Sequence, residues 1–511
     1  MPRYVSVLMH RHKLNSMLVY FVVGGMSAFL AWDSPTRAMP VEAIQRSCFA
    51  VLAFFALGTF CFLRAKQREG TLHLSNLSVW LGVLFFAEFG VAPCVAALLG
   101  YEEWDYALFV AMSLATAGSA AYWIGTSVLS RLPRVTGYIA RFKRPAHTRL
   151  RWIIGLFLLS TVCKLALITA GLYMYAGTGD LKHFESISFV QWLVVPANFG
   201  WFALAMMCTE RFGTEPCNSV KRWTWVILSV NLLFGLVSGM KSEILMIPLI
   251  VFIMSRLVTG RTWWTAGFGI GVLLVLMYPV HSYFRQNLRD AGGVGSVGKG
   301  VDLAARSLNE ATTENSSYEL LQGGFEASVN RLNLLSTLHW LLNDGGTTDL
   351  KGGEKAWMVP IYAFVPRVIW PDKPVLDKGR RLSLAMGAGD ATSTAVTPFG
   401  DLYILGGAWA IPAGMFFLGV LIQAFANLVQ GTYDAKKLFI YMLLFQKCML
   451  PEADLFLFWS GIVQTAVVAC VVGFAVYGGA PWALSAVSRG EAEDIERAAI
   501  SLETHASAAS A

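Results

Sequence analysis

The sequence predicts an all-α, polytopic membrane protein with about twelve transmembrane helices. The first observation is composition: of the 511 residues, 55% are hydrophobic and only 14% are charged, whereas soluble domains carry about 25% charged residues. The second is a series of apolar runs that approach the length of about 20 residues that a spanning helix needs. The third is that Lys and Arg gather in alternate short loops. That pattern orients membrane proteins.

The predicted spans follow one another along most of the chain. They cover residues 14–32, 43–63, 78–99, 106–129, 152–175, 189–208, 223–238, 243–257, 263–281, 402–428, 438–449 and 455–477. The runs at 243–257 and 438–449 are the shortest candidates. The first run lacks a small-x-small cleavage site, so we expect an uncleaved first helix rather than a signal peptide.

Basic loops set the predicted orientation. They carry Arg3, Arg11 and Lys13; Arg64, Lys66 and Arg68; several cations between residues 130 and 151; Lys221 and Arg222; Arg256 and Arg261; and Lys436 and Lys437. All of these lie on one side if both termini are cytoplasmic, as the positive-inside rule requires. The cysteines form no CxxC pair, so neither a disulfide framework nor a zinc site is expected.

Four regions follow from this topology. They are an N-terminal transmembrane bundle (1–281), an extracytoplasmic loop domain (282–401), C-terminal transmembrane helices (402–479) and a cytoplasmic tail (480–511). A structureless loop as long as the second region would be unusual, and functional loops are the usual exception. Within it, residues 317–344 carry leucines and aromatics at helical spacing, which predicts one or two amphipathic helices.

Cations from separate segments reach the outer headgroup level in this topology. The stretch "AFVPRVIWPDKPVLDKGRR" (363–381) holds Arg367, Asp372, Lys373, Lys378, Arg380 and Arg381; Arg285 and Arg289 leave the ninth span one helical turn apart; and Lys241 lies in the turn "SGMKSE". Such cations either anchor the chain to lipid headgroups or bind a pyrophosphate, whose oxygens Arg recognises bidentately. Their density favours the pyrophosphate interpretation. Trp370 either marks the interface or stacks on a sugar face.

Other ionisable residues have two interpretations each. Glu88 and Lys164 lie inside predicted spans, where ionisable groups are functional by default, but a structural hydrogen bond fits Glu88, and snorkelling or pairing within the bundle fits Lys164. His339 in "STLHWLL" is either a base or a packing residue. Asp401 lies near the start of the tenth span, in "TPFGDLYILGG" (397–407), where it could accept a proton.

The string "FVPRVIWPDKP" (364–374) resembles the Pro-Arg-x-x-Trp-Pro-x-Lys-Pro signature of bacterial oligosaccharide repeat-unit polymerases, the O-antigen (Wzy-type) polymerase-like membrane proteins. Weaker similarities are "SGMKSEILMIPL", "YFRQN", "VNRLNLL" and "TPFGDLYILGG", so the resemblance covers residues 235–425. The first two hundred residues match only in hydropathy. Lys241 stands where the family turn has Arg, which keeps the charge but loses the bidentate geometry.

The resemblance implies a GT-C-like glycosyltransferase of the bacterial inner membrane that uses neither a nucleotide sugar nor another cofactor. Such enzymes join undecaprenyl-pyrophosphate-linked oligosaccharide repeat units at the periplasmic face. The catalytic residues it implies here are Arg367, Arg285 and Asp401. The substrate-binding residues it implies are Arg289, Arg331, Lys373, Lys241, Arg380, Arg381, Asp372 and Trp370.

The expected partners are the lipid-linked oligosaccharide, membrane lipids, a chain-length regulator and a flippase, with no nucleic acid and no metal. Two alternatives stay open. An O-antigen ligase-type transferase uses the same donor, and a polysaccharide exporter or flippase belongs to a different class. Transporters commonly show internal repeats and discontinuous helices near the midplane, whereas the polar residues here gather outside the membrane, which favours an enzyme.

Overall fold

The computed structural model describes residues 39–69, 76–129, 146–170, 188–213, 217–238, 240–259, 297–314, 317–344, 378–387, 394–429, 435–448 and 455–477, with a few further positions between these ranges. All regular secondary structure in these ranges is helical. The predicted all-α class is therefore confirmed for the part of the chain that the structure describes.

Seven helical segments among the described residues are long and apolar enough to cross a membrane. They are α2 (Val41–Arg68), the continuous series of α3 (Leu77–Phe86), η3 (Ala87–Val91) and α4 (Ala92–Leu98), then α5 (Tyr106–Leu129), α6 (Ala146–Thr169), α8 (Ser188–Ala197) with α9 (Phe199–Phe212), α10 (Asn218–Ser238) and α20 (Ala410–Val429). Helices α11 (Lys241–Thr259), α21 (Ala435–Cys448) and α22 (Leu455–Tyr477) pack among them. The predicted spans at 14–32 and 263–281 lie outside the described residues, so a total of twelve stays a prediction.

Outward faces of these helices carry large apolar side chains. Trp225 on α10, Phe417 on α20 and Val471 on α22 are 66%, 68% and 64% exposed. Isolated apolar side chains are common on soluble surfaces, but such side chains on several long apolar helices indicate contact with lipid. The chain is therefore a membrane protein by its helices as well as by its composition.

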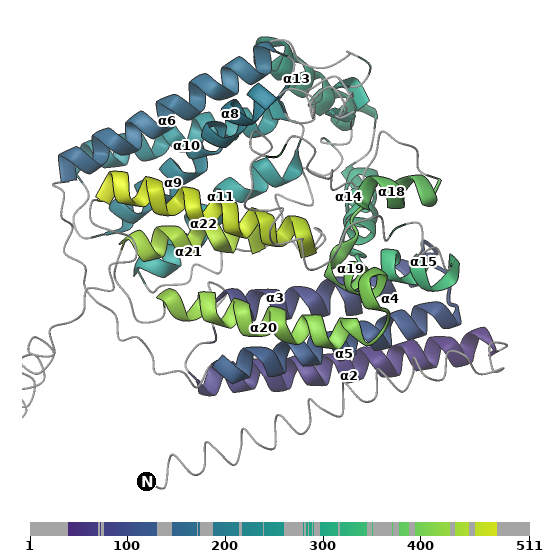
Figure 1. Cartoon of the computed structure of the whole chain (residues 1–511). Coiled ribbons are helices and arrows are strands. Elements are labelled where there is room, and N and C mark those ends of the chain that lie inside the picture. The colour runs from purple at the N-terminus through teal and green to yellow at the C-terminus, as the bar shows by residue number, and fades with distance from the viewer. Residues whose placement is uncertain are drawn as a thin grey trace, which may run out of the picture.

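Helix α5 lies at the centre of one layer of the bundle, against α2, α3 and α20 (Figure 1). It approaches α20 closely because glycines face backbone atoms across the interface. A Cβ atom on Gly125 would lie 2.1 Å from the carbonyl oxygen of Phe416, and one on Gly419 would lie 2.1 Å from that of Tyr122. Small residues allow this kind of close packing between membrane helices.

Replacing Gly125 with alanine is expected to destabilise the protein by about 3 kcal/mol, because the added methyl group meets backbone that cannot rotate away. The matched control is Gly155→Ala on α6, where an added Cβ meets no atom within 4 Å. Unfolding of both variants in detergent measures the difference. Equal unfolding temperatures for the two variants would contradict the α5–α20 packing.

Two helix interruptions have local causes. The π-helical turn η3 comes just before Pro93, which lacks an N–H and whose ring clashes with the carbonyl four residues earlier, so the helix widens there. The predicted span 402–428 is wrong as a single helix. It divides into α19 (Thr397–Gly406) and α20 at Gly407, whose φ of 69° and ψ of −163° are readily adopted only by glycine. The predicted boundary between residues 401 and 402 therefore falls inside α19.

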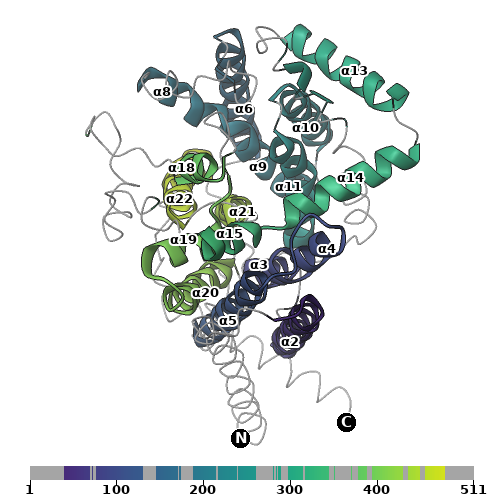
Figure 2. The ribbon, with the colours of Figure 1, turned by 90° about the vertical axis from the view of Figure 1, so that its right-hand side faces the viewer.

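Short helices gather at one end of the bundle, which we call the loop-helix end. They are α13 (Val297–Glu314), α14 (Ser317–Leu332), α15 (Ser336–Asp344) and α18 (Lys378–Ala385), and Figure 2 looks onto this end. Helices α14 and α15 confirm the amphipathic helices predicted for 317–344. The predicted loop domain therefore contains ordered helices that cover the ends of the longer ones.

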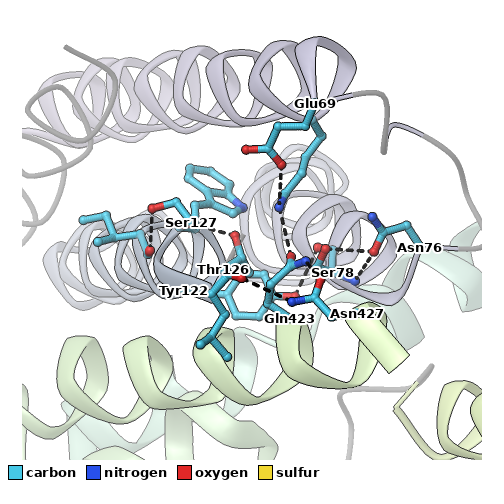
Figure 3. A network of polar contacts seen from close by, with 12 residues as sticks. Glu69, Asn76, Ser78, Tyr122, Thr126, Ser127, Gln423 and Asn427 are labelled. Carbon is cyan, nitrogen blue, oxygen red and sulfur yellow. Dashed lines mark hydrogen bonds and ion pairs between the residues drawn. The ribbon is translucent and has the colours of Figure 1, made fainter. Parts of the chain in front are cut away.

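A polar network joins helices at the opposite end of the bundle (Figure 3). Lys66 at the end of α2 is 2% exposed and donates to Gln423 on α20 at 2.9 Å. Asn427, which accepts from Gln423, donates to the carbonyl of Leu129 at the end of α5. The topology predicts Lys66 as a loop cation. The structure buries it instead, and its contacts hold the ends of α2, α5 and α20 together.

Candidate functional site

The structure describes only some of the predicted site residues. Arg285, Arg289, Arg367, Asp372 and Lys373 lie outside the described residues, and Lys241 is described by its backbone alone, as the first residue of α11. A basic cavity shared by the predicted arginines therefore stays a prediction. Trp370 is half-buried, Arg331 is exposed on α14, and Arg380, Arg381 and Asp401 lie at the loop-helix end.

Asp401 forms a buried ion pair. Its Oδ1 atom lies 2.8 Å from the ammonium of Lys378, and the two side chains are 1% and 3% exposed. Its Oδ2 atom accepts the backbone N–H of Leu455 at 3.1 Å. Leu455 is the first residue of α22, where backbone N–H groups lack partners within the helix and favour a carboxylate. One carboxylate thus joins α18, α19 and α22.

The turn into α19 positions Asp401. Thr397 is fully buried and has a φ of 61°, which is unusual and costly for a β-branched residue. Its hydroxyl accepts the backbone N–H of Gly400 at 3.2 Å, and Pro398 begins the helix with a suitable fixed φ. Phe399 packs against Phe89, with ring centroids 4.4 Å apart. The sequence "TPFGD" is therefore a strained, well-anchored turn that fixes the start of α19.

Helix α15 supports the same turn from the other side. The hydroxyl of Thr337 donates to the carbonyl of Ala395 at 2.6 Å. A Cβ atom on Gly400 would lie 3.2 Å from the methyl of Thr337, so the two residues are in close contact. A shift of α15 would therefore move the segment that carries Asp401.

The first turn of α18 concentrates positive charge. Lys378, Arg380 and Arg381 all lie in it, and both arginines are half-buried. The positive end of the helix dipole disfavours cations at this position. The first turn of α18 thus brings three cations together, and one of them, Lys378, is paired with Asp401.

His339 lies at the centre of a second polar cluster, formed by Glu102, Asp105, Asn333, His339 and Asn343, which we call the His339 cluster. Its Nδ1 atom lies 2.8 Å from Glu102 and its Nε2 atom 2.8 Å from Asp105. Asn333 donates to Glu102 at 2.9 Å and Asn343 to Asp105 at 2.7 Å. Neither predicted role fits, because the ring is neither packed in an apolar core nor free to accept a proton.

Charge in the His339 cluster follows from these contacts. Burial alone lowers the pKa of His339, but hydrogen bonds and the charges of Asp105 and Glu102 outweigh burial and raise the pKa to about 9. Burial alone raises the pKa of Asp105, but hydrogen bonds from His339 and Asn343 outweigh it and lower the pKa below its ordinary value. His339 is therefore an imidazolium at neutral pH, held between two carboxylates.

Lys164 and Glu88, which lie inside predicted spans, are both buried. Lys164 donates to Asn231 on α10 at 3.3 Å and lies 5.3 Å from the centre of the Phe234 ring. Of its two predicted arrangements, pairing within the bundle is confirmed. Glu88 is 3% exposed and lies in η3, next to Phe89.

Sequence comparison places most of the chain in one family. Residues 94–474 match a domain of unknown function (DUF8712). The chain belongs to the DUF8712 family. No curated protein and no solved structure matches it. The His339 cluster, the first turn of α18 and the turn into α19 all lie within the DUF8712 domain, so both polar groups belong to the part of the chain that defines the family.

Proposed function

We propose that this protein is a polysaccharide polymerase that joins undecaprenyl-pyrophosphate-linked oligosaccharide repeat units at the periplasmic face of the bacterial inner membrane. The observation that carries the proposal is the short distance in sequence between the polymerase-like string and a basic helix. The string at 364–374 ends three residues before α18, whose first turn holds Lys378, Arg380 and Arg381, and Lys378 is paired with Asp401. The polymerase-like string and the basic first turn of α18 are thus parts of one segment of the chain.

The chemistry needs cations more than a covalent catalyst. A hydroxyl of the acceptor repeat unit forms a bond to the anomeric carbon of the growing chain, and the bond from that carbon to the pyrophosphate oxygen breaks. The electron pair leaves with undecaprenyl pyrophosphate, whose growing negative charge arginines stabilise. The hydroxyl proton passes to a base. Arg367, Arg285 and Arg289 are proposed to hold the pyrophosphate, with Arg380 and Arg381 at the edge of the same site.

The contacts of Asp401 favour a positioning role. Each of its oxygens accepts one hydrogen bond, from Lys378 and from the N–H of Leu455. The side chain is almost fully buried and is paired with a charge that favours its ionised form. We therefore propose that Asp401 orients α18 and its arginines. Arg331, Lys241, Lys373, Asp372 and Trp370 stay in the proposal as substrate-binding residues.

A transporter function is the second candidate, because ionisable groups within spans are frequent in transport proteins. Lys164 and Glu88 are both buried in the spanning helices. A ligase-type transferase shares the donor and the anionic leaving group, so the same cations suit it.

Deletion of the gene separates these functions. For a polymerase, single repeat units on undecaprenyl pyrophosphate are expected to accumulate, since export to the periplasm precedes joining. A ligase deletion leaves lipid-linked polymer instead, and an exporter deletion leaves single units confined to the cytoplasmic leaflet. Sizing of the extracted lipid-linked glycans distinguishes single units from polymer, and access of a membrane-impermeant reagent from the periplasmic side distinguishes the two leaflets. Normal polymer in the deletion strain would contradict the proposal.

A further inference from the structure

The His339 cluster connects three parts of the chain that are far apart in sequence. His339 and Asn343 lie on α15, Asn333 lies between α14 and α15, and Glu102 and Asp105 lie in the turn before α5. Asp105 also accepts the backbone N–H of Leu108 at 2.7 Å, so it caps α5. Since α5 is the central helix of its layer, the cluster fixes α15 to a rigid part of the bundle.

The opposite side of α15 contacts the candidate site. Thr337, two residues before His339, bonds to Ala395 and lies against Gly400 in the turn that positions Asp401. Helix α15 is therefore a short rigid connection with His339 at one contact and the turn into α19 at the other. A change in how α15 docks on α5 is transmitted over only a few residues.

We propose that His339 is a positioning residue: its positive charge holds α15 between the acidic turn at 101–105 and the turn into α19, so that deprotonation of His339 loosens the candidate site. The contact is an ionic one because each ring nitrogen faces a carboxylate oxygen. A neutral imidazole has no charge, so both carboxylates, which are largely buried, lose their charged partner. It also donates only one N–H, so one of the two carboxylates loses its hydrogen bond as well.

The charged and titratable groups on the surrounding elements set the direction of the effect. They are Tyr101, Glu102, Glu103 and Asp105 in the turn, Tyr106 on α5, Glu326 and Arg331 on α14, and Asp401, paired with Lys378, on α19. Tyr101 donates to Glu326 at 2.7 Å, so the same turn is also tied to α14. Acidic groups predominate next to the ring, which favours its charged form.

The sign of the pH dependence follows from this. The pKa of His339 is higher in the folded protein than its ordinary value of 6.5. The stabilisation that the charged ring gives to the docking of α15 is therefore complete below pH 6.5 and disappears as the pH rises through about 9. Docking of α15 is thus expected to weaken in alkali.

The test measures hydrogen exchange of backbone amides in the purified full-length protein, in peptides that cover 336–344 and 394–406. Wild type is compared with His339→Gln, which is neutral at every pH, and with His339→Lys, which keeps a charge to about pH 10.4. Comparison at one pH removes the intrinsic pH dependence of exchange. Below pH 6.5, both peptides of His339→Gln are expected to exchange at least about tenfold faster than wild type. Above pH 9, wild type should approach His339→Gln, while His339→Lys stays slow.

Asn343→Ala is the matched control, because it removes another hydrogen bond to Asp105 from the same helix but leaves the titrating ring. This variant should exchange faster at every pH yet keep the wild-type pH dependence. If the ratio of the exchange rates of His339→Gln and wild type were the same below pH 6.5 and above pH 9, the inference would be wrong. An effect confined to 336–344 with none at 394–406 would also overturn it.

The consequence for catalysis rests on the proposed function. Polymer formation by wild type should fall through the same pH range, and the fall should be smaller for His339→Lys. A protein that makes no polymer at any pH but shows the expected exchange pattern refutes the proposed function and supports the role of His339. Polymer formation without the expected exchange pattern supports the proposed function and refutes the role of His339.

Discussion

Removal of either charge of the Lys378–Asp401 pair is expected to destabilise the protein by about 3–5 kcal/mol, because each single replacement leaves the other charge buried without its partner. Both side chains are almost fully buried. Asp401→Ala also removes the acceptor for the first N–H of α22. Denaturant unfolding in detergent measures the loss for Lys378→Ala and Asp401→Ala. The control is Lys221→Ala, which removes an exposed cation on α10 and should stay within about 0.5 kcal/mol of wild type.

The double replacement Lys378→Met with Asp401→Leu distinguishes a positioning role of Asp401 from a role in proton transfer. Apolar residues of similar size often replace a buried ion pair at little cost or with a gain in stability. If Asp401 acts by positioning α18, the double variant should recover most of the stability and part of the activity. If Asp401 is the general base, the variant recovers stability alone. A single Lys378→Ala variant as stable as wild type would contradict the buried pair itself.

Arg367→Lys is expected to lower the rate of polymer formation by about 10²–10³, the usual cost of losing one well-placed donor to a developing negative charge. Lysine keeps the charge but not the forked, bidentate geometry that matches pyrophosphate oxygens. Initial rates with lipid-linked oligosaccharide measure the effect, and the unfolding temperature checks that the variant folds.

Arg306→Lys is the control for Arg367→Lys. Arg306 is exposed on α13 and belongs to no proposed site, so a lysine there should retain most of the activity. A near wild-type rate for Arg367→Lys would mean that Arg367 is an interfacial anchor rather than a ligand of the pyrophosphate.

Much of the fold could be predicted from the sequence, because a spanning helix makes its backbone hydrogen bonds within itself and is recognised by the length of its apolar run. The spacing of the leucines in residues 317–344 also predicts the helices found there. The break at Gly407 was missed because a pair of glycines in an apolar run is also common inside membrane helices. The burial of Lys66 cannot be predicted from its neighbours in the sequence. It depends on Gln423 of α20, which lies 357 residues further along the chain.

The candidate site was predicted only in part. Asp401 was found through its motif, but its partner Lys378 was one of several cations in 363–381, and nothing in their spacing indicates which one is buried. The partners of His339 were hidden for the same reason: they lie over two hundred residues away, in the acidic turn 101–105. Pairing between distant charged residues depends on tertiary packing, which local pattern does not encode.

Polymer formation by the purified protein is the direct test of the proposed polymerase activity. The full-length protein in liposomes is given an undecaprenyl-pyrophosphate-linked repeat unit as the only sugar source, and products are separated by size. We expect a ladder of glycans on undecaprenyl pyrophosphate, with release of one undecaprenyl pyrophosphate for each bond formed and without any nucleotide sugar. Unchanged single repeat units, with wild-type protein that is folded and inserted, would contradict it.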